Sequence, residues 1–172
     1  FYAFFTGAAS AQSILTEEEK GTLPRLFTTP TSTATILSGK FLAVLIILLV
    51  QVSILLLFSR FVFDIHWGSS FDVILVAAGL ILLATTCGFF IISFLKNSRQ
   101  AGVVFGGVLT FTGMIGIFTV FTSGAPNTSQ ISEPISLIVP QGWAMRSLRL
   151  VMNGAPLRET LPFLAGQLAW ST

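Results

Sequence analysis

The chain has 172 residues, of which 53% are hydrophobic and only 9% are charged, and its formal net charge is +2. An average soluble domain has about 25% charged residues, so this composition leaves too little polar surface to cover a water-soluble globule. It predicts an integral membrane protein of the all-α class. The nine Lys and Arg residues stand singly or in pairs at the ends of apolar runs. That distribution excludes a nucleic-acid partner and makes these residues markers of membrane topology.

The first stretch, residues 1–15, is apolar but would be only about 22 Å long as a helix, whereas a hydrocarbon core is about 30 Å thick. We interpret it as the inner end of a span. Residues 158–172 would start another span at the other end of the chain. We therefore expect residues 1–172 to be a single transmembrane domain truncated at both ends. A signal peptide is the alternative for the first stretch, but no basic leader precedes it and an acidic cluster follows.

Residues 16–40 are charged and contain Gly21, Pro24 and Pro30. A charge at the centre of a bilayer costs roughly 2.5–3.5 kcal/mol even on the insertion scale, so this segment has to face water. We interpret it as a cytoplasmic coupling element that a soluble partner contacts. The alternative is a solvated loop whose acids contact only water.

Three complete spans are predicted, at residues 41–63, 73–95 and 101–125. Each contains at least nineteen successive residues without a charge, which is long enough to cross the membrane as a helix. No ionisable residue interrupts these charge-free runs. Transport driven by protons or sodium ions normally uses such residues inside the membrane, so the sequence argues against that class.

The basic residues predict the orientation of these spans through the positive-inside rule. Bases cluster before the first complete span and between the second and the third, whereas a single base follows the first. The bases on the expected cytoplasmic side are Lys20, Arg25, Lys40, Lys96 and Arg99, and the outer one is Arg60. We expect residues 61–72 and the long segment from residue 126 to lie outside.

The outer segment at residues 131–154 contains two apolar pieces that are each too short to span. The second piece has Trp143 and two arginines on separate helical stripes, which predicts an amphipathic helix with an aromatic at headgroup depth. Pro140 breaks the segment, and Asn153 with Gly154 is a stop signal. We interpret residues 131–154 as a re-entrant or interfacial hairpin. An amphipathic helix lying passively on the membrane is the alternative.

Small residues recur along one stripe of the third span at Gly102, Gly106 and Gly113. Such a stripe lets helix backbones approach closely in lipid, so we expect it to pack against another helix. Glycines could equally leave room for a substrate path.

The motifs of hydrolases, metalloproteases, redox proteins and phosphate-binding loops do not occur in the sequence. The single His66 stands beside Trp67 in the short outer loop, where an interfacial anchor is the usual role, and no metal site is expected. We therefore predict no catalytic residue and no enzyme activity in this chain. If the protein works against a gradient, the energy has to come from another polypeptide.

Two motifs give the chain a family resemblance. The first runs from Glu17 and Glu19 through Gly21-Thr22-Leu23 to Leu26, Thr29-Pro30 and Gly39-Lys40, and it leads directly into a span. The second is Pro140, Gly142 and Trp143, followed by an amphipathic stretch. Together they resemble the ABC-2 type permeases, the membrane subunits of one class of ATP-binding-cassette exporters, over essentially the whole chain.

The resemblance implies a transmembrane bundle of the type V exporter kind in a plasma membrane, bacterial or archaeal, with six helices per half. On this scheme the chain holds the end of helix two, helices three to five, the outer hairpin and the start of helix six. Its partners would be an ATPase subunit, a second permease copy or a paralogue, and the lipid bilayer. ATP and magnesium would bind the ATPase, and this chain would bind no cofactor.

The resemblance also gives the segment at residues 16–40 a role in docking on the ATPase. Acidic side chains would meet basic or polar groups of that subunit, apolar side chains would be the buried anchors, and a glycine would allow a tight bend. The residues are Glu17, Glu19, Gly21, Thr22, Leu23, Leu26 and Phe27.

A membrane scaffold or assembly protein that transports nothing is the alternative from a different class. Its cytoplasmic segment would bind a partner without ATP-linked motion. The cargo of a permease stays open between drugs, lipids, glycans and peptides, although uncharged spans favour amphipathic or hydrophobic cargo.

Overall fold

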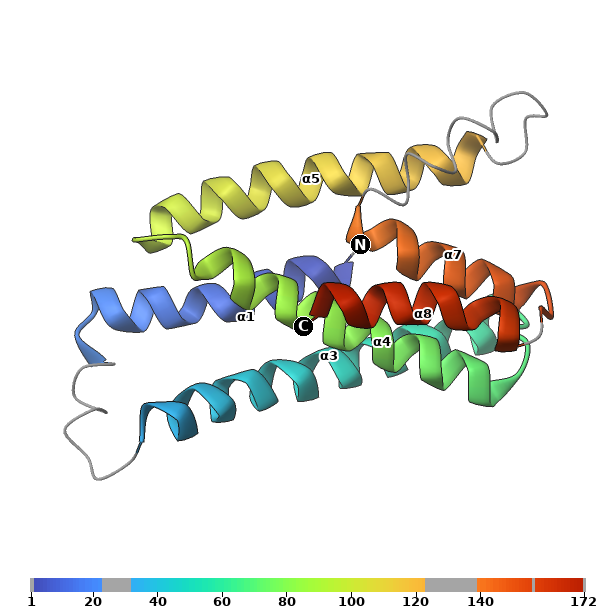
Figure 1. Cartoon of the computed structure of the whole chain (residues 1–172), viewed down its shortest axis with the longest axis horizontal. Coiled ribbons are helices and arrows are strands. Elements are labelled where there is room, and N and C mark those ends of the chain that lie inside the picture. Colours follow the sequence, from blue (N-terminus) through green and yellow to red (C-terminus); the bar gives the residue numbers. More distant parts are fainter. Residues whose placement is uncertain (1, 23–31, 123–138, 156, 172) are drawn as a thin grey trace.

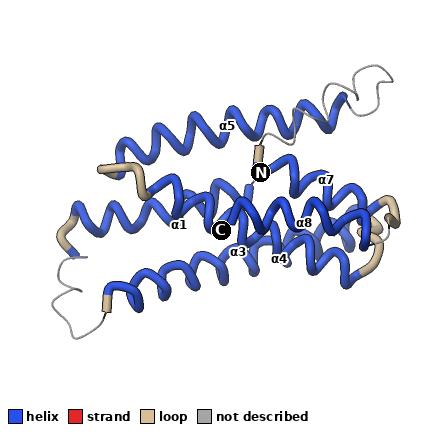
Figure 2. Tube along the Cα trace, viewed as in Figure 1, coloured by secondary structure: helices blue, strands red, loops and turns tan. Residues whose placement is uncertain are grey.

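The structure is a computed structural model that describes residues 2–22, 32–122, 139–155 and 157–171. These residues form helices, turns and loops without a strand (Figure 2), as the composition predicts. The helices are α1 (Tyr2–Glu19), α3 (Thr33–Phe63), α4 (Ser70–Ile92), α5 (Ser98–Thr122), α7 (Pro140–Met152) and α8 (Leu157–Ser171) (Figure 1).

Among the described residues, three helices are long and apolar enough to cross a membrane: Thr33–Phe63, Ser70–Ile92 and Ser98–Phe118. Their outer faces carry large exposed apolar side chains, and Phe61 is 81% exposed. In water such a surface would cause aggregation, but lipid tails are as apolar as these side chains. The all-helical bundle is therefore the fold of a membrane protein.

Helix α4 is the centre of the bundle, because it contacts α1, α3, α7 and α8. One buried cluster joins α1, α3, α4 and α5, and it includes Ala11, Leu48, Leu83 and Ala101, each fully buried. The hydroxyl of the fully buried Thr85 donates to the carbonyl of Ile81 one turn earlier (2.8 Å). That local bond satisfies a polar group that has no water to contact.

Helices α1 and α4 approach each other closely where both carry glycine. A Cβ atom added to Gly7 would lie 2.8 Å from the carbonyl oxygen of Ala84, and one added to Gly88 would lie 3.0 Å from the carbonyl oxygen of Gly7. The two backbones are thus in contact, which only small residues permit.

The helices extend past the predicted spans at their N-terminal ends. Helix α3 begins at Thr33 rather than at residue 41, and Ser32 caps it by accepting a hydrogen bond from the Thr35 amide (3.2 Å). The predicted span begins after Lys40 because a charge cannot lie deep in lipid. A helix can continue into water beyond its apolar part, so the charge marks the edge of the lipid and not the end of the helix.

The loop between α3 and α4 packs against α7. Helix α3 ends at Asp64 in the left-handed conformation (φ +50°), and Gly68 has φ +86°. Gly68 lies directly against the backbone carbonyl of Val151, where no side chain would fit. The Trp67 indole Nε1 donates to Ser59 Oγ (3.0 Å), so this loop is held to α3 as well as to α7.

Candidate functional site

The acidic end of α1, Glu17 to Glu19, is bound to two other helices of the same chain. Lys40 Nζ of α3 donates to Glu17 Oε2 (2.5 Å). The Lys40 side chain is 21% exposed and that of Glu17 is 36% exposed. An ion pair in partial contact with water contributes only about 0–1 kcal/mol. Its value here is geometric, because it fixes the distance between α1 and α3 beyond their apolar parts.

Glu19 caps the start of α5. The Ser98 amide donates to Glu19 Oε1 (2.7 Å), and Ser98 Oγ donates to Glu19 Oε2 (2.5 Å). A carboxylate at a helix N-terminus accepts from amides that have no partner inside the helix and faces the positive end of the helix dipole. The side-chain bond from Ser98, followed by its backbone bond, holds the pKa of Glu19 below its ordinary value of 4.5.

One further side chain joins α1 to α5, and another caps the first turn of α5 from within its own segment. Gln12 Nε2 of α1 donates to the Ser98 carbonyl (2.7 Å). Asn97 Oδ1 accepts from the Gln100 amide (2.7 Å), which satisfies another amide of the first turn of α5. The first turn of α5 is therefore held to α1 through Ser98, which Gln12 and Glu19 both contact.

A left-handed turn ends α1. Gly21 has φ +68°, a conformation that favours glycine, and its amide donates to the Glu18 carbonyl (3.0 Å). Thr22 Oγ1 donates back to the Glu17 carbonyl (2.9 Å). The predicted anchors Leu23, Leu26 and Phe27 lie outside the described residues.

Glu18 is the one acid of the Glu17–Glu19 cluster that is not among the predicted docking residues. It is exposed, and its carboxylate forms no ion pair or hydrogen bond with any described residue. The sequence signal was available, since Glu18 stands between Glu17 and Glu19 and points about 100° away from each on a helix. It is the acid of this group whose charge is not already used by a described neighbour.

Helix α7 starts at Pro140, deep along α5. Gln141 is 5% exposed, and its Nε2 donates to Thr112 Oγ1 of α5 (2.9 Å). Thr112 lies ten residues before the end of α5 at Thr122, which is about 15 Å along the helix. The start of α7 is therefore far inside the bundle, and the neighbouring Gly142 is buried.

Trp143 packs between α7 and α8. Its ring centroid is 5.8 Å from that of Phe163, and the indole covers Gly166 so closely that no Cβ would fit there. The Arg146 guanidinium carbon lies 5.0 Å from the Phe163 centroid, in cation–π geometry. The sequence predicts Trp143 at headgroup depth, and in the structure its ring is half-buried in the contact between α7 and α8.

Beyond Pro140, α7 runs toward the end of the bundle where the loop joins α3 to α4, and it ends at Met152, directly before the expected stop at Asn153 and Gly154, whose φ is +71°. The helix contacts α4, α5 and α8, and Ser147 in its middle is fully buried. A helix lying passively on the membrane would have no such buried face. The first half of the predicted hairpin, residues 131–138, lies outside the described residues.

The glycine stripe of the third span lies on α5. Gly113 is buried, Gly106 is half-buried and Gly102 is exposed. A Cβ at Gly102 would lie 3.7 Å from Gln12 Nε2, and one at Gly106 would meet no described neighbour within 4 Å. The closer helix crossing, between Gly7 and Gly88, was not predicted. The run Gly7-Ala8-Ala9-Ser10-Ala11 was its signal in the sequence.

These features define a class of protein: a helical membrane domain with a charged helix end on one side and a partial-depth helix on the other. The family model described as ABC-2 family transporter protein matches residues 1–171. The chain belongs to the ABC-2 transporter family and is one of its permeases.

The chain is 28% identical over 175 residues to the linearmycin resistance permease protein LnrN of Bacillus subtilis (strain 168). The match covers 99% of this chain and 44% of that protein. The chain thus spans less than half the length of this curated relative. No solved structure shows significant similarity to the chain.

Proposed function

We propose that this chain is the membrane-spanning part of an ABC-2 exporter permease in the plasma membrane, driven by ATP that a separate ATPase subunit hydrolyses. The observation that supports this most strongly is the bonding of the acidic end of α1. Its charges face water beside a left-handed turn, yet Glu17 and Glu19 are bound to α3 and α5. A partner that displaces this end displaces both helices with it.

The proposed coupling continues from α5 to α7. Glu19 holds the first turn of α5 through Ser98, and Thr112 in the middle of α5 accepts from Gln141 at the start of α7. Movement of the ATPase subunits would therefore change the position of α7. A switch of this kind needs contacts that differ between two states. The polar bonds between these helices are few enough to be replaced by other contacts in the second state.

The depth at which α7 begins supports a re-entrant hairpin that closes the outer end of the pathway. In this proposal Pro140 sets the bend, Gly142 allows close packing, and Trp143 fixes the helix against α8 through Gly166. Of the predicted glycine stripe of α5, Gly113 is already buried in this chain, whereas Gly102 and Gly106 would be open to a neighbouring helix of the complete transporter.

The experiment uses the full-length permease with its ATPase, reconstituted in proteoliposomes. Glu18→Lys should weaken co-purification of the ATPase on the order of tenfold, because it reverses an exposed interfacial charge and breaks no described contact. Glu17→Lys should uncouple ATP hydrolysis by separating α1 from α3. The double variant Glu17→Lys with Lys40→Glu restores an ion pair and should restore the hydrolysis rate.

The matched control is Glu159→Lys in the first turn of α8, at the other end of the bundle, which should leave ATPase association unchanged. If Glu18→Lys and Glu17→Lys both behave like this control, the coupling assignment is wrong. The alternative of a membrane scaffold without transport would then be favoured.

The cargo proposal rests on the relative and on the composition. The name of the Bacillus relative connects that protein with linearmycin resistance, and the uncharged spans of this chain favour amphipathic or hydrophobic molecules. We therefore propose drug-like molecules as the first candidates for the cargo, lipids as the second, and glycans and peptides after them. The transporter would be completed by a second permease copy or a paralogue.

A further inference from the structure

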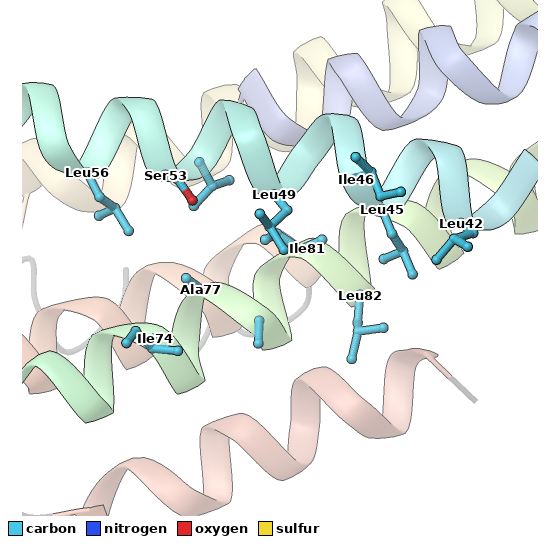
Figure 3. A pocket seen from close by; sticks show the side chains of 12 residues that line it. Leu42, Leu45, Ile46, Leu49, Ser53, Leu56, Ile74, Ala77, Ile81 and Leu82 are labelled. Atoms are coloured by element: carbon cyan, nitrogen blue, oxygen red, sulfur yellow. The ribbon is translucent and has the colours of Figure 1, made fainter.

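An apolar groove runs between α3 and α4 (Figure 3). Its volume is about 500 Å³. Side chains of α3 such as Leu42, Leu49 and Leu56 face Ile74, Ala77 and Ile81 of α4 across it. Ser53 is the one side chain with a polar atom among those that line this groove.

The groove continues toward the loop that joins the two helices. A second cavity of about 370 Å³ shares Ser53, Leu56 and Ile74 with the first and extends to Arg60, Trp67 and Ser70. The hydrogen bond from Trp67 to Ser59 fixes the indole at this mouth. The lining therefore changes from apolar side chains with one Ser53 hydroxyl to a cation, an indole and the Ser70 hydroxyl at this end.

Arg60 at the mouth is exposed and forms no ion pair with any residue in the described ranges. Two acids lie at the same end of the bundle, Asp64 at the end of α3 and Asp72 in the first turn of α4, but neither lines the groove. The mouth is therefore suited to an anion, and a guanidinium can bind a phosphate with two parallel hydrogen bonds.

The groove is longer than one leaflet of a bilayer. Its lining on α3 runs from Leu42 to Arg60, eighteen residues or about 27 Å, and half of a hydrocarbon core is about 15 Å, so an acyl chain anchored at Arg60 would fill the part from Arg60 to about Leu49. An Arg and a Trp at the end of such a stretch lie where headgroups lie. Because α3 and α4 touch each other, the space between them suits a single acyl chain better than a helix about 10–12 Å wide.

We propose that this groove binds an anionic phospholipid of the leaflet at the Arg60 end, which the loop charges predict to be the outer one. One acyl chain lies between α3 and α4, and the phosphate contacts the Arg60 guanidinium. The site is separate from the coupling residues at the other end of the bundle. It does not depend on the transport proposal, because a lipid can bind whether or not cargo moves.

The test is photocrosslinking of the full-length permease with its ATPase in phosphatidylcholine nanodiscs. The probe is phosphatidylglycerol with a diazirine on its acyl chain, and the comparison probe is phosphatidylcholine with the same chain. The phosphatidylglycerol probe should label the α3 peptide around Ser53 and the α4 peptide around Ile74. Arg60→Gln should lower that labelling about fivefold, to the level of the comparison probe, because one interfacial charge is lost.

Three further variants make the result specific. Arg60→Lys keeps the charge and should retain most of the labelling. Arg99→Gln, which removes a cation at the other end of the bundle, should change nothing. Ala78→Phe fills the groove and should lower labelling by both probes, whereas Val103→Phe on the exposed face of α5 should not.

The melting temperatures of all variants check that each protein is folded. A cysteine introduced by Ser53→Cys tests by cross-linking whether protein lies in the groove. Equal labelling by the two probes with no effect of Arg60→Gln would overturn the proposal in favour of non-specific lipid contact. A disulfide or bifunctional cross-link from that cysteine to a second permease copy, or to another part of the full-length chain, would also overturn it. In that case protein fills the groove.

Discussion

Gly88 stands where α4 crosses α1, and its backbone leaves no room for a side chain beside Gly7. Gly88→Val should destabilise the permease by about 1–3 kcal/mol, because overpacking forces two touching backbones apart. The measurement is the melting temperature of the solubilised full-length protein. Gly107→Val is the matched control, since a Cβ there meets no described neighbour within 4 Å. Equal losses in the two variants would contradict a close α1–α4 crossing.

Glu19 should make stability depend on pH. Its pKa is lowered in the folded protein from an ordinary value of 4.5, first by the Ser98 hydroxyl and then by the Ser98 amide. A lowered folded pKa means that the contact contributes fully above about pH 4.5 and is lost as the pH falls through the folded pKa. Glu19→Gln should therefore lower the melting temperature at pH 7, and the difference from wild type should shrink below pH 4.5.

Glu18→Gln controls for the general effect of removing an acid from this end of α1. Glu18 has no described partner, so its replacement should leave the melting temperature almost unchanged at both pH values. A pH-independent difference between wild type and Glu19→Gln would mean that the Ser98 contacts do not form in the folded protein.

The partners of these acids could not be read from the sequence. The charges of Glu17 and Glu19 predict contact with water, and both side chains are indeed at the edge of the bundle. Their bonds go to Lys40 and to Ser98, which is 79 residues away from Glu19. Nothing in the local pattern of either segment identifies the other, because the pairing depends on how α1 packs against α3 and α5.

A substitution in α7 tests whether this helix closes the outer end of the pathway as part of the proposed hairpin. Trp143→Ala removes the indole that covers Gly166, and deletion of a packed Trp costs about 3–5 kcal/mol when the space stays empty. Export by the full-length transporter should fall strongly while the protein still inserts into the membrane. The measurement is the resistance of cells to a toxic cargo, or the uptake of cargo by inverted vesicles. The amount of permease in the membrane is measured alongside.

Met152→Ala on the same helix is the control, because Met152 is exposed at the outer end. Its replacement should leave export near wild type. If Trp143→Ala also exports normally, α7 has only a packing role and does not close the pathway.

The positions of the long helices were predictable, while their ends and crossings were not. A charge-free run of nineteen residues or more can only be a span in a chain of this composition, so α3, α4 and α5 follow from hydropathy alone. Their N-terminal extensions lie in water, where apolar periodicity carries no signal. The depth of α7 depends on the Gln141–Thr112 bond and on the space above Gly166, both of which require the three-dimensional arrangement.

The orientation of the whole molecule can be tested by thiol labelling in a Cys87→Ser background. A cysteine at Ser69, exposed between α3 and α4, should react with a membrane-impermeant reagent in intact cells. A cysteine at Lys96, exposed between α4 and α5, should react only after the cells are opened. Lys96 is a better position than Ser98, which is half-buried and bound to Glu19. The reverse pattern would invert the topology.

The family could be identified from the sequence because its motifs fall on residues that the fold uses. Gly21 ends α1 in a left-handed turn, and Pro140 begins α7. Gly and Pro at such positions can be recognised in a single sequence, since few other residue types fit a left-handed turn or the start of a helix equally well. The groove between α3 and α4 has no comparable signal, because leucines that line it look like leucines that face lipid.

The central position of α4 has a consequence for biosynthesis. Val73 and Val76 at its outer end are buried only in a cluster that includes Val151 of α7 and Leu164 of α8, and these residues leave the ribosome long after α4. The growing chain therefore holds α4 in the membrane with one face uncovered until α8 is made. Insertion machinery or a chaperone that shields this face during translation would raise the yield of permease, and a ribosome stalled before residue 157 would release a protein that proteases remove.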